Sequence, residues 1–256
     1  MKEPPVFALV GNTPLVEIGR LNPHRARGVR VFAKLEGLNP GGSVKDRAAL
    51  GMVRDALARG RLRPGVGLLD ATSGNTGIAY AMLCAALGAR CRLYVPANAS
   101  PERLALLRAY GAEVALTDPL DGMDGAIDAA HAAAKAEPDA WHHPDQYANP
   151  ANPGAHAATT APEIWAQTEG TVTHLVAGLG TTGTLMGTAR GLRARNPDVQ
   201  SWAVEPDGPM HGIEGLKHMP TSHVPAILRR EEITGSVAVP TERARATARD
   251  LARKEG

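Results

Sequence analysis

The sequence has few aromatic residues, two cysteines, almost no excess charge and no long apolar run. Aromatic residues occupy 4% of the 256 positions, and 28 Lys and Arg face 26 Asp and Glu, leaving a net charge of +2. No basic run is interleaved with aromatic residues, so nothing favours a nucleic-acid partner. No apolar stretch reaches the roughly 18 residues of a membrane helix, so we expect no membrane span.

Cysteine usage and the N-terminal sequence favour a cytoplasmic protein. Cys84 and Cys91 match no zinc or C-x-x-C pattern, and a secreted disulfide scaffold would carry more cysteines. We interpret both as small buried hydrophobic residues in a reducing compartment. The first residues, MKEPPVFALVGNTP, place prolines and an acid where a signal peptide needs an apolar core.

Strand-like and helix-like segments alternate along most of the chain, which predicts an α/β fold with parallel strands and crossover helices. Strands are expected at 29–35, 67–71, 90–95, 113–116, 174–178, 200–205 and 237–239, and helices at 46–59, 76–87, 101–110, 122–136, 156–169, 183–195 and 241–254. The Pro- and Asn-rich stretch 144–154 interrupts this rhythm and is the expected hinge between two lobes. Because no strand follows the last helix, we expect the sequence to be a fragment of a longer polypeptide.

A glycine-rich loop at 178–183, G-L-G-T-T-G, lies between an expected strand and an expected helix. Its backbone N–H groups would meet an anion at the helix N-terminus. The loop also fits the dinucleotide fingerprint, with Glu205 at the expected distance, so an NAD-dependent dehydrogenase is an alternative. The hydroxyls of Thr181, Thr182 and Thr184 favour a monophosphate. The loop at 178–183 could also be a tight turn between strand and helix that binds no ligand.

A second loop of the same kind, T-S-G-N-T-G at 72–77, also follows an expected strand and precedes an expected helix. It offers N–H groups, hydroxyls and the Asn75 amide to an anion. The simpler interpretation is a turn in which Asn75 or Thr76 caps the helix. Two such loops at the carboxyl edge of a parallel sheet favour a ligand, because open α/β sheets bind ligands there.

A lysine follows a glycine turn in the third motif, N-P-G-G-S-V-K-D-R at 39–47. Lys45 could be an ordinary solvated side chain in a helix start capped by Ser43 and Asp46. Near a helix N-terminus its pKa would fall, however, which frees the amine as nucleophile and base. A nucleophilic lysine, a phosphate loop and a carboxylate loop together describe a site for pyridoxal 5′-phosphate and an amino acid.

Five motifs carry a resemblance to a known family. They are G-N-T-P-L at 11–15, K-L-E-x-x-N-P-G-G-S-V-K-D-R at 34–47, T-S-G-N-T-G at 72–77, N-P-x-N-P at 149–153 and G-T-T-G-T at 180–184. In this order they resemble the cysteine synthase and cystathionine β-synthase family of fold type II pyridoxal-phosphate enzymes. Residues 159–165 and 212–219 are most similar to its cysteine synthase B branch.

The resemblance implies a two-lobed, tryptophan synthase β-like α/β fold and a homodimer. The smaller mobile lobe would span 46–148, and the larger lobe 1–45 and 149–256. A serine in a later S-S-G stretch contacts the pyridine nitrogen in this family. That stretch normally follows a segment like 251–256, so its absence here agrees with the expected fragment.

The resemblance also implies residue roles and a reaction. Lys45 would form the Schiff base with the cofactor, Asn75 would contact its 3-hydroxyl, and Gly180, Thr181, Thr182, Gly183 and Thr184 would bind its phosphate; Thr72, Ser73, Gly74, Asn75, Thr76 and Gln146 would bind the substrate carboxylate. No metal is expected in this site. The implied reaction is β-replacement, which makes L-cysteine from O-acetyl-L-serine and sulfide, or S-sulfocysteine from thiosulfate.

Related β-replacement or β-elimination chemistry stays open at this point. An O-phosphoserine sulfhydrylase, a cystathionine β-synthase-like enzyme and a serine dehydratase would all use the same motifs. Lys217 stands where some members of the family carry an arginine that favours O-phosphoserine. Since lysines are seldom buried, we expect Lys217 to be a solvated loop residue and O-acetylserine to be the better donor.

Overall fold

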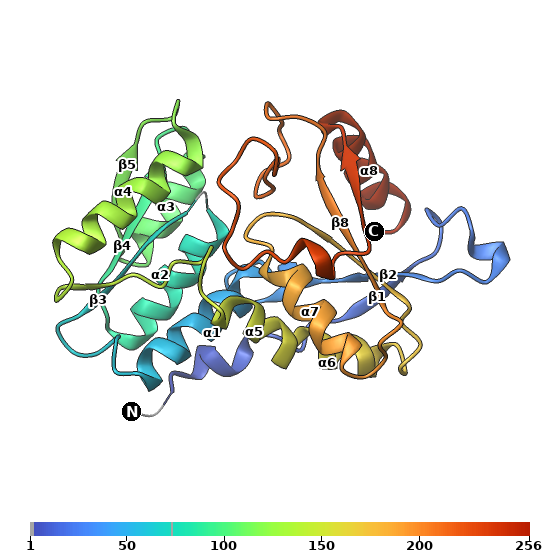
Figure 1. Ribbon diagram of the computed structural model, residues 1–256, viewed down its shortest axis with the longest axis horizontal. Coiled ribbons are helices and arrows are strands. Elements are labelled where there is room, and N and C mark those ends of the chain that lie inside the picture. Colours follow the sequence, from blue (N-terminus) through green and yellow to red (C-terminus); the bar gives the residue numbers. More distant parts are fainter. Residues whose placement is uncertain (1–2, 73) are drawn as a thin grey trace.

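The computed structural model describes residues 3–72 and 74–256, and Figure 1 shows its sheets flanked by helices. The strands are β1 (Leu15–Ile18), β2 (Val31–Lys34), β3 (Gly67–Ala71), β4 (Cys91–Pro96), β5 (Glu113–Thr117), β6 (Trp141–His142), β7 (His174–Gly178), β8 (Gln200–Pro206) and β9 (Gly235–Val239). The helices are α1 (Lys45–Ala58), α2 (Asn75–Leu87), α3 (Pro101–Ala109), α4 (Gly122–Ala136), α5 (Ala151–Ala158), α6 (Thr160–Gln167), α7 (Gly183–Arg193) and α8 (Thr241–Lys254). Short 3₁₀ turns are η1 (Pro5–Leu9), η2 (Arg25–Arg27), η3 (Glu36–Leu38) and η4 (Arg230–Glu232).

Two parallel sheets form the frame of the molecule, as the alternation of segments predicts. One has the strand order β5-β4-β3-β6 and the other β7-β8-β9, while β1 and β2 form an antiparallel pair. All five residues of β3 are buried, which is typical of a parallel strand covered on both faces. In Figure 1 the two parallel sheets lie on opposite sides, with α1, α5 and α7 between and below them.

Helix α2 is apolar on nearly all sides and is therefore a central element. It packs against α1, α3 and the four-stranded sheet, and Tyr80 and Leu83 on it are fully buried. Cys84 on α2 and Cys91 on β4 are free and buried, which confirms their interpretation as small core residues. No helix among the residues described is long and apolar enough to cross a membrane.

Residues 144–169 differ from the expectation in where their helices begin and end. Four of the eleven residues of the expected hinge are helical, because α5 begins at Ala151 and its Pro153 lies in the first turn, where a missing N–H is tolerated. The single helix expected at 156–169 is two helices, which break at Thr159. Pro162 explains the break: it lacks an N–H, and its ring would collide with the carbonyl four residues earlier, at Ala158. Helix α5 packs between α1 and α7.

Candidate active site

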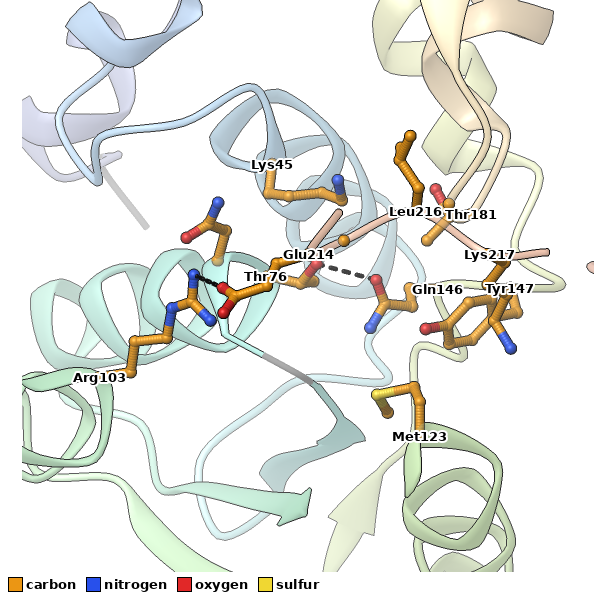
Figure 2. A pocket seen from close by; sticks show the side chains of 13 residues that line it. Lys45, Thr76, Arg103, Met123, Gln146, Tyr147, Thr181, Glu214, Leu216 and Lys217 are labelled. Atoms are coloured by element: carbon orange, nitrogen blue, oxygen red, sulfur yellow. Dashed lines mark hydrogen bonds and ion pairs between the residues drawn. The ribbon is translucent and has the colours of Figure 1, made fainter. Parts of the chain in front are cut away.

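A cavity of about 170 Å³ lies between the two parallel sheets, where the loops after β3 and β7 meet (Figure 2). It is lined by Lys45, Asn75, Thr76, Arg103, Met123, Gln146, Tyr147, Gly180, Thr181, Glu214, Gly215, Leu216 and Lys217. Six of the residues expected from the sequence are among them: Lys45, Asn75, Thr76, Gln146, Gly180 and Thr181. The structure thus brings the three motifs to one place.

Lys45 is the first residue of α1, and its side chain extends into the cavity (Figure 2). Its backbone N–H donates to Ser43 Oγ at 3.2 Å, which fixes the entry into the helix. Among the residues described, no hydrogen bond or ion pair involves its Nζ. Burial lowers the pKa of this amine, because the ammonium form loses hydration. The interpretation of Lys45 as a solvated side chain is therefore wrong, and the amine is suited to act as nucleophile and base.

A buried ion-pair network anchors α1 immediately after Lys45. The Arg47 side chain is 1% exposed; its Nε donates to Glu36 Oε2 and its Nη1 to Glu163 Oε1, both at 2.7 Å. Although burial acts in the opposite direction, the bonds from Arg47 and Lys34 lower the pKa of Glu163 to about 2. The network joins η3, α1 and α6, so the helix that carries Lys45 is fixed at its origin.

Asp46 connects the same helix to the glycine turn before it. Its Oδ2 accepts a hydrogen bond from the Gly41 N–H at 2.5 Å. The residue is fully buried, and its Oδ1 has no partner among the residues described. Burial raises the pKa of Asp46 to about 6, with the negative charge of Glu36 as a lesser cause in the same direction. This carboxyl group holds the turn in place while being costly to ionise.

The loop after β3 is fastened by Thr72. Its Oγ1 accepts hydrogen bonds from the Gly74 N–H at 3.0 Å and the Gly77 N–H at 2.9 Å. A Cβ on Gly77 would collide with the Thr72 methyl group, so the start of α2 can lie this close to Thr72 only because residue 77 is glycine. The Thr72 hydroxyl, expected to bind substrate, thus faces the loop itself. Ser73 lies outside the described residues, and Asn75 and Thr76 line the cavity.

Gln146 connects this loop to the chain after β6. Its Oε1 accepts from Thr76 Oγ1 at 2.8 Å, shown dashed in Figure 2, and its Nε2 donates to the Ala71 carbonyl at 2.6 Å. The side-chain amide has a second N–H for a ligand. Gln146 is therefore held in a fixed orientation at the wall of the cavity.

The loop after β7 has the features of an anion site. Thr182 adopts φ +72° at the start of α7, is 2% exposed, and its Oγ1 has no partner among the described residues. At Gly180 a Cβ would collide with the Gly215 carbonyl, and at Gly183 with the Asn152 side chain. A buried hydroxyl beside the N-terminus of a helix suits an anionic oxygen such as that of a phosphate.

Two residues of α5 that the sequence analysis did not single out support this loop. Asn152 Nδ2 donates to the Gln146 carbonyl at 2.7 Å and to Thr181 Oγ1 at 3.2 Å. His156 lies between Thr160 Oγ1, at 2.9 Å, and Thr184 Oγ1, at 3.3 Å. Burial lowers the pKa of His156 to about 3, so its ring is neutral. Asn152 belongs to the N-P-x-N-P motif and could have been found from it, whereas nothing in the sequence distinguishes His156.

Two ion pairs connect the elements around the cavity mouth. Arg103 on α3 contacts Glu214 at 2.6 Å (Figure 2), and Lys217 Nζ contacts Asp124 Oδ1 on α4 at 2.7 Å. Lys217 is buried and also lies over the ring of Tyr147, 5.1 Å from its centroid. The expectation of a solvated Lys217 is therefore wrong, because Asp124 offers this lysine a carboxylate inside the fold.

Two parallel sheets that meet at a buried lysine and two anion-receptive loops define an α/β enzyme of the fold type II pyridoxal-phosphate class. Residues 6–256 match the family described as pyridoxal-phosphate dependent enzyme, and the chain belongs to this family. Its cofactor is therefore pyridoxal 5′-phosphate. This assignment replaces the dehydrogenase interpretation of the loop 178–183.

Several proteins similar to this chain are named cysteine synthase or cysteine synthase B. A cysteine synthase from Aquifex aeolicus is 50% identical over 98% of this chain and 77% of its own length. Cysteine synthase B from Salmonella typhimurium is 45% identical over 96% of this chain and 80% of its own length. Among solved structures, a cysteine synthase from Entamoeba histolytica has a TM-score of 0.91 and 34% identity, covering 100% of this chain and 80% of that one.

The residues present fit the cofactor. The loop that contains the unpaired Thr182 hydroxyl would hold the phosphate, and Lys45 reaches the same cavity with an amine whose pKa is lowered. Asn75 lies on the cavity wall, where it could contact a polar group of the ring. When bound, the cofactor supplies an electron sink that acidifies the α-proton of an attached amino acid.

Proposed function

We propose that this chain is a cysteine synthase that replaces the acetoxy group of O-acetyl-L-serine with sulfide, releasing L-cysteine and acetate. The observation that carries the proposal is the position of Lys45, whose amine enters a cavity bounded by both the β3–α2 loop and the β7–α7 loop. One loop suits a phosphate and the other an amino-acid carboxylate. The names of the relatives supply the reaction class.

Each part of the site has a role in this reaction. Lys45 Nζ is the nucleophile toward the cofactor aldehyde, and it removes the α-proton of the substrate at the same place. The backbone N–H groups of Asn75 and Thr76 and the second N–H of Gln146 bind the substrate carboxylate, whereas the Gly74 and Gly77 N–H groups already donate to Thr72 Oγ1. Residues 180–184 hold the cofactor phosphate. Closure of the cavity would keep water away from the reactive intermediate.

O-Acetylserine is the donor that the charges favour over O-phosphoserine. Lys217 lines the cavity, but its ammonium group is already paired with Asp124 at 2.7 Å and faces the Tyr147 ring. A neutralised point charge attracts a second anion weakly and lacks the bidentate geometry that arginine offers a phosphate. Thiosulfate as an alternative nucleophile to sulfide stays part of the proposal.

The proposal also covers the organisation of the protein. The segment 46–148 is proposed as the smaller lobe, which moves against 1–45 and 149–256. It contains the four-stranded sheet with α2, α3 and α4, whereas the second parallel sheet lies in the larger lobe. Homodimeric assembly follows the family resemblance. A cytoplasmic location agrees with two buried cysteines that remain unpaired.

Replacing Lys45 with alanine tests the function. Since one amine serves as nucleophile and as base, cysteine formation should fall by several orders of magnitude. The visible absorbance that borohydride removes should be lost as well, whereas circular dichroism should not change. Lys135→Ala, at an exposed lysine of α4, is the matched control. Unchanged turnover in Lys45→Ala would contradict the proposal.

The same assay separates the donors. For the unaltered protein we expect a higher kcat/KM with O-acetylserine than with O-phosphoserine at equal sulfide. A preference for O-phosphoserine of more than about tenfold, or about 1.4 kcal/mol, would overturn the choice of donor while leaving the reaction class intact.

A further inference from the structure

A cluster of metal-binding side chains lies outside the cavity, between α4 and the segment after β6. It consists of His131, His143 and Asp145, whose ligand atoms all lie within 4.8 Å of one another. His131 Nε2 is 3.3 Å from Asp145 Oδ2, and the two imidazole rings meet edge to face with centroids 5.0 Å apart. Ligand atoms around tetrahedral zinc are about 3.3 Å apart, so a modest rotation of His131 would complete the set.

A buried carboxylate orients the second histidine. His143 Nε2 lies 3.3 Å from Asp70 Oδ1, and the Asp70 side chain is only 2% exposed. Although burial lowers it, this hydrogen bond raises the pKa of His143 on balance. Because Nε2 of His143 is engaged by Asp70, Nδ1 is the ring nitrogen that remains free to coordinate a metal ion. Metal-bound histidines almost always have such a carboxylate, carbonyl or water on the other nitrogen, where it fixes the tautomer and the ring orientation.

The third ligand is held by its own backbone. Asp145 has φ +53°, and its Oδ1 accepts from the Tyr147 N–H at 3.2 Å. This turn leaves Oδ2 directed at His131. The His131 side chain is 49% exposed, so an ion can enter from solvent without disturbing the core. Two imidazoles and one carboxylate form the donor set of a Zn²⁺ site with one open position, and the solvent access of His131 lets a water molecule occupy that position.

We propose that His131, His143 and Asp145 form a binding site for a divalent transition metal of the Zn²⁺ class, separate from the cofactor cavity. Nitrogen-rich sets of this kind favour Zn²⁺, Co²⁺ or Ni²⁺ over Mg²⁺ and Ca²⁺, which require oxygen ligands. Three protein ligands leave one position for water or an exchangeable ligand. The site therefore takes and releases metal, unlike a closed four-ligand structural site.

The site is connected to the cavity through Asp70. The same carboxylate that orients His143 also accepts, through Oδ2, a hydrogen bond from the Gln146 N–H at 3.3 Å. Gln146 in turn contacts Thr76 in the cavity wall. A bound metal would join α4 to the chain segment from which Gln146 and Tyr147 reach the cavity. Metal binding thus stabilises this part of the structure in its present arrangement.

Calorimetric titration of the cofactor-loaded protein with ZnCl₂ at pH 8, without amino acids, tests the site. We expect one Zn²⁺ per chain and a rise in melting temperature on saturation. His131→Ala removes an exposed ligand, and Asp145→Asn removes one charged ligand but keeps a residue that tolerates positive φ. Each should weaken Zn²⁺ binding by at least about tenfold, since even outer-shell losses cost that much.

His174→Ala, at an exposed histidine on β7, is the matched control and should bind Zn²⁺ as the unaltered protein does. Two results would overturn the proposal: no Zn²⁺ binding at micromolar concentration, or stoichiometric binding that survives both His131→Ala and Asp145→Asn. Either result would leave the cysteine synthase proposal untouched, because the site shares no residue with the cofactor loops.

Discussion

At the residue scale, the backbone conformation, the burial and the hydroxyl group of Thr182 all favour a role in binding an anion. It has a left-handed backbone conformation, is 2% exposed and carries a hydroxyl without a partner among the residues described. A buried unpaired hydroxyl costs free energy unless a ligand satisfies it. In the function proposed above, the ligand that satisfies it is the phosphate of the cofactor.

Substituting Thr182 tests whether its hydroxyl binds the phosphate. Thr182→Ala removes one charge-assisted hydrogen bond, worth about 1.5–3 kcal/mol, so the Kd for pyridoxal phosphate should rise roughly ten- to hundredfold. Equilibrium dialysis of the cofactor-free protein measures this value. Thr188→Ala is the control, because Thr188 Oγ1 is equally buried and unpaired within the described chain but lies further along α7. An equal loss in both variants would mean that Thr182 acts only through packing.

At the scale of elements, the start of α1 combines Lys45, the proposed catalytic residue, with a carboxyl group whose ionisation is unfavourable. Folding raises the pKa of Asp46 from 3.8 to about 6. Between these values the unfolded carboxyl releases a proton that the folded one keeps. This contribution to the free energy of unfolding is present below about pH 4 and is lost as the pH rises to about 6.

The corresponding prediction compares the unaltered protein with Asp46→Asn, whose amide oxygen can still accept from Gly41. The difference in unfolding free energy should shift in favour of the variant by about 1.4 kcal/mol per pH unit between about pH 4 and 6, about 3 kcal/mol in total, and then level off. Urea unfolding at a series of pH values measures it. A difference that does not change with pH would show that Asp46 titrates alike in the folded and unfolded chain.

The bounds of the helices and strands could be predicted from the sequence where the signal is local, and not elsewhere. The bounds of β3, α4, β7 and α8 agree with the prediction, because apolar periodicity and helix caps are local signals. Ser100, for instance, caps α3 by accepting from the Arg103 N–H. The break at Thr159 was also readable, from Pro162. The strands β1 and β6 were missed; β6 has two residues, too few to carry any periodicity.

The site divides in the same way. Lys45 and the two loops were predictable because glycine turns at strand ends are local in the sequence. His156 and Arg103 could not be placed, because their roles depend on contacts between distant segments, whereas Asn152 lies in the N-P-x-N-P motif and could have been found from it. Lys217 is the clearest case: its partner Asp124 is 93 positions away, and without that partner burial of a lysine is unfavourable.

At the scale of the whole molecule, the two ion pairs at the cavity mouth should differ in how much they contribute to the free energy of unfolding. Arg103 and Glu214 are 30% and 69% exposed, so Arg103→Gln should lower the free energy of unfolding by less than about 1 kcal/mol. Lys217 is 8% exposed and Asp124 30%, and Lys217→Met leaves the carboxylate without its cation. We expect a loss of about 1–3 kcal/mol, below that of a fully buried pair.

Urea denaturation of the two variants side by side measures this difference. Methionine is close to lysine in length and volume, so packing changes little, while the contact of the ammonium group with the Tyr147 ring is lost together with the ion pair. Equal losses for Arg103→Gln and Lys217→Met would show that burial does not set the strength of these connections.

The contact between Arg47 and Glu163 has a consequence for the order of events during synthesis. Its two partners are 116 positions apart, so closing the loop between them costs chain entropy that local contacts do not. While the chain emerges from the ribosome, α1 and its ion pair with Glu36 can form early, but the ion pair with Glu163 forms only after α6 has been made. The phosphate loop follows later still, at 180–184. If the site is as proposed, a nascent chain thus acquires Lys45 long before it can retain the cofactor, and loading with pyridoxal phosphate has to wait until residues 180–184 have been made.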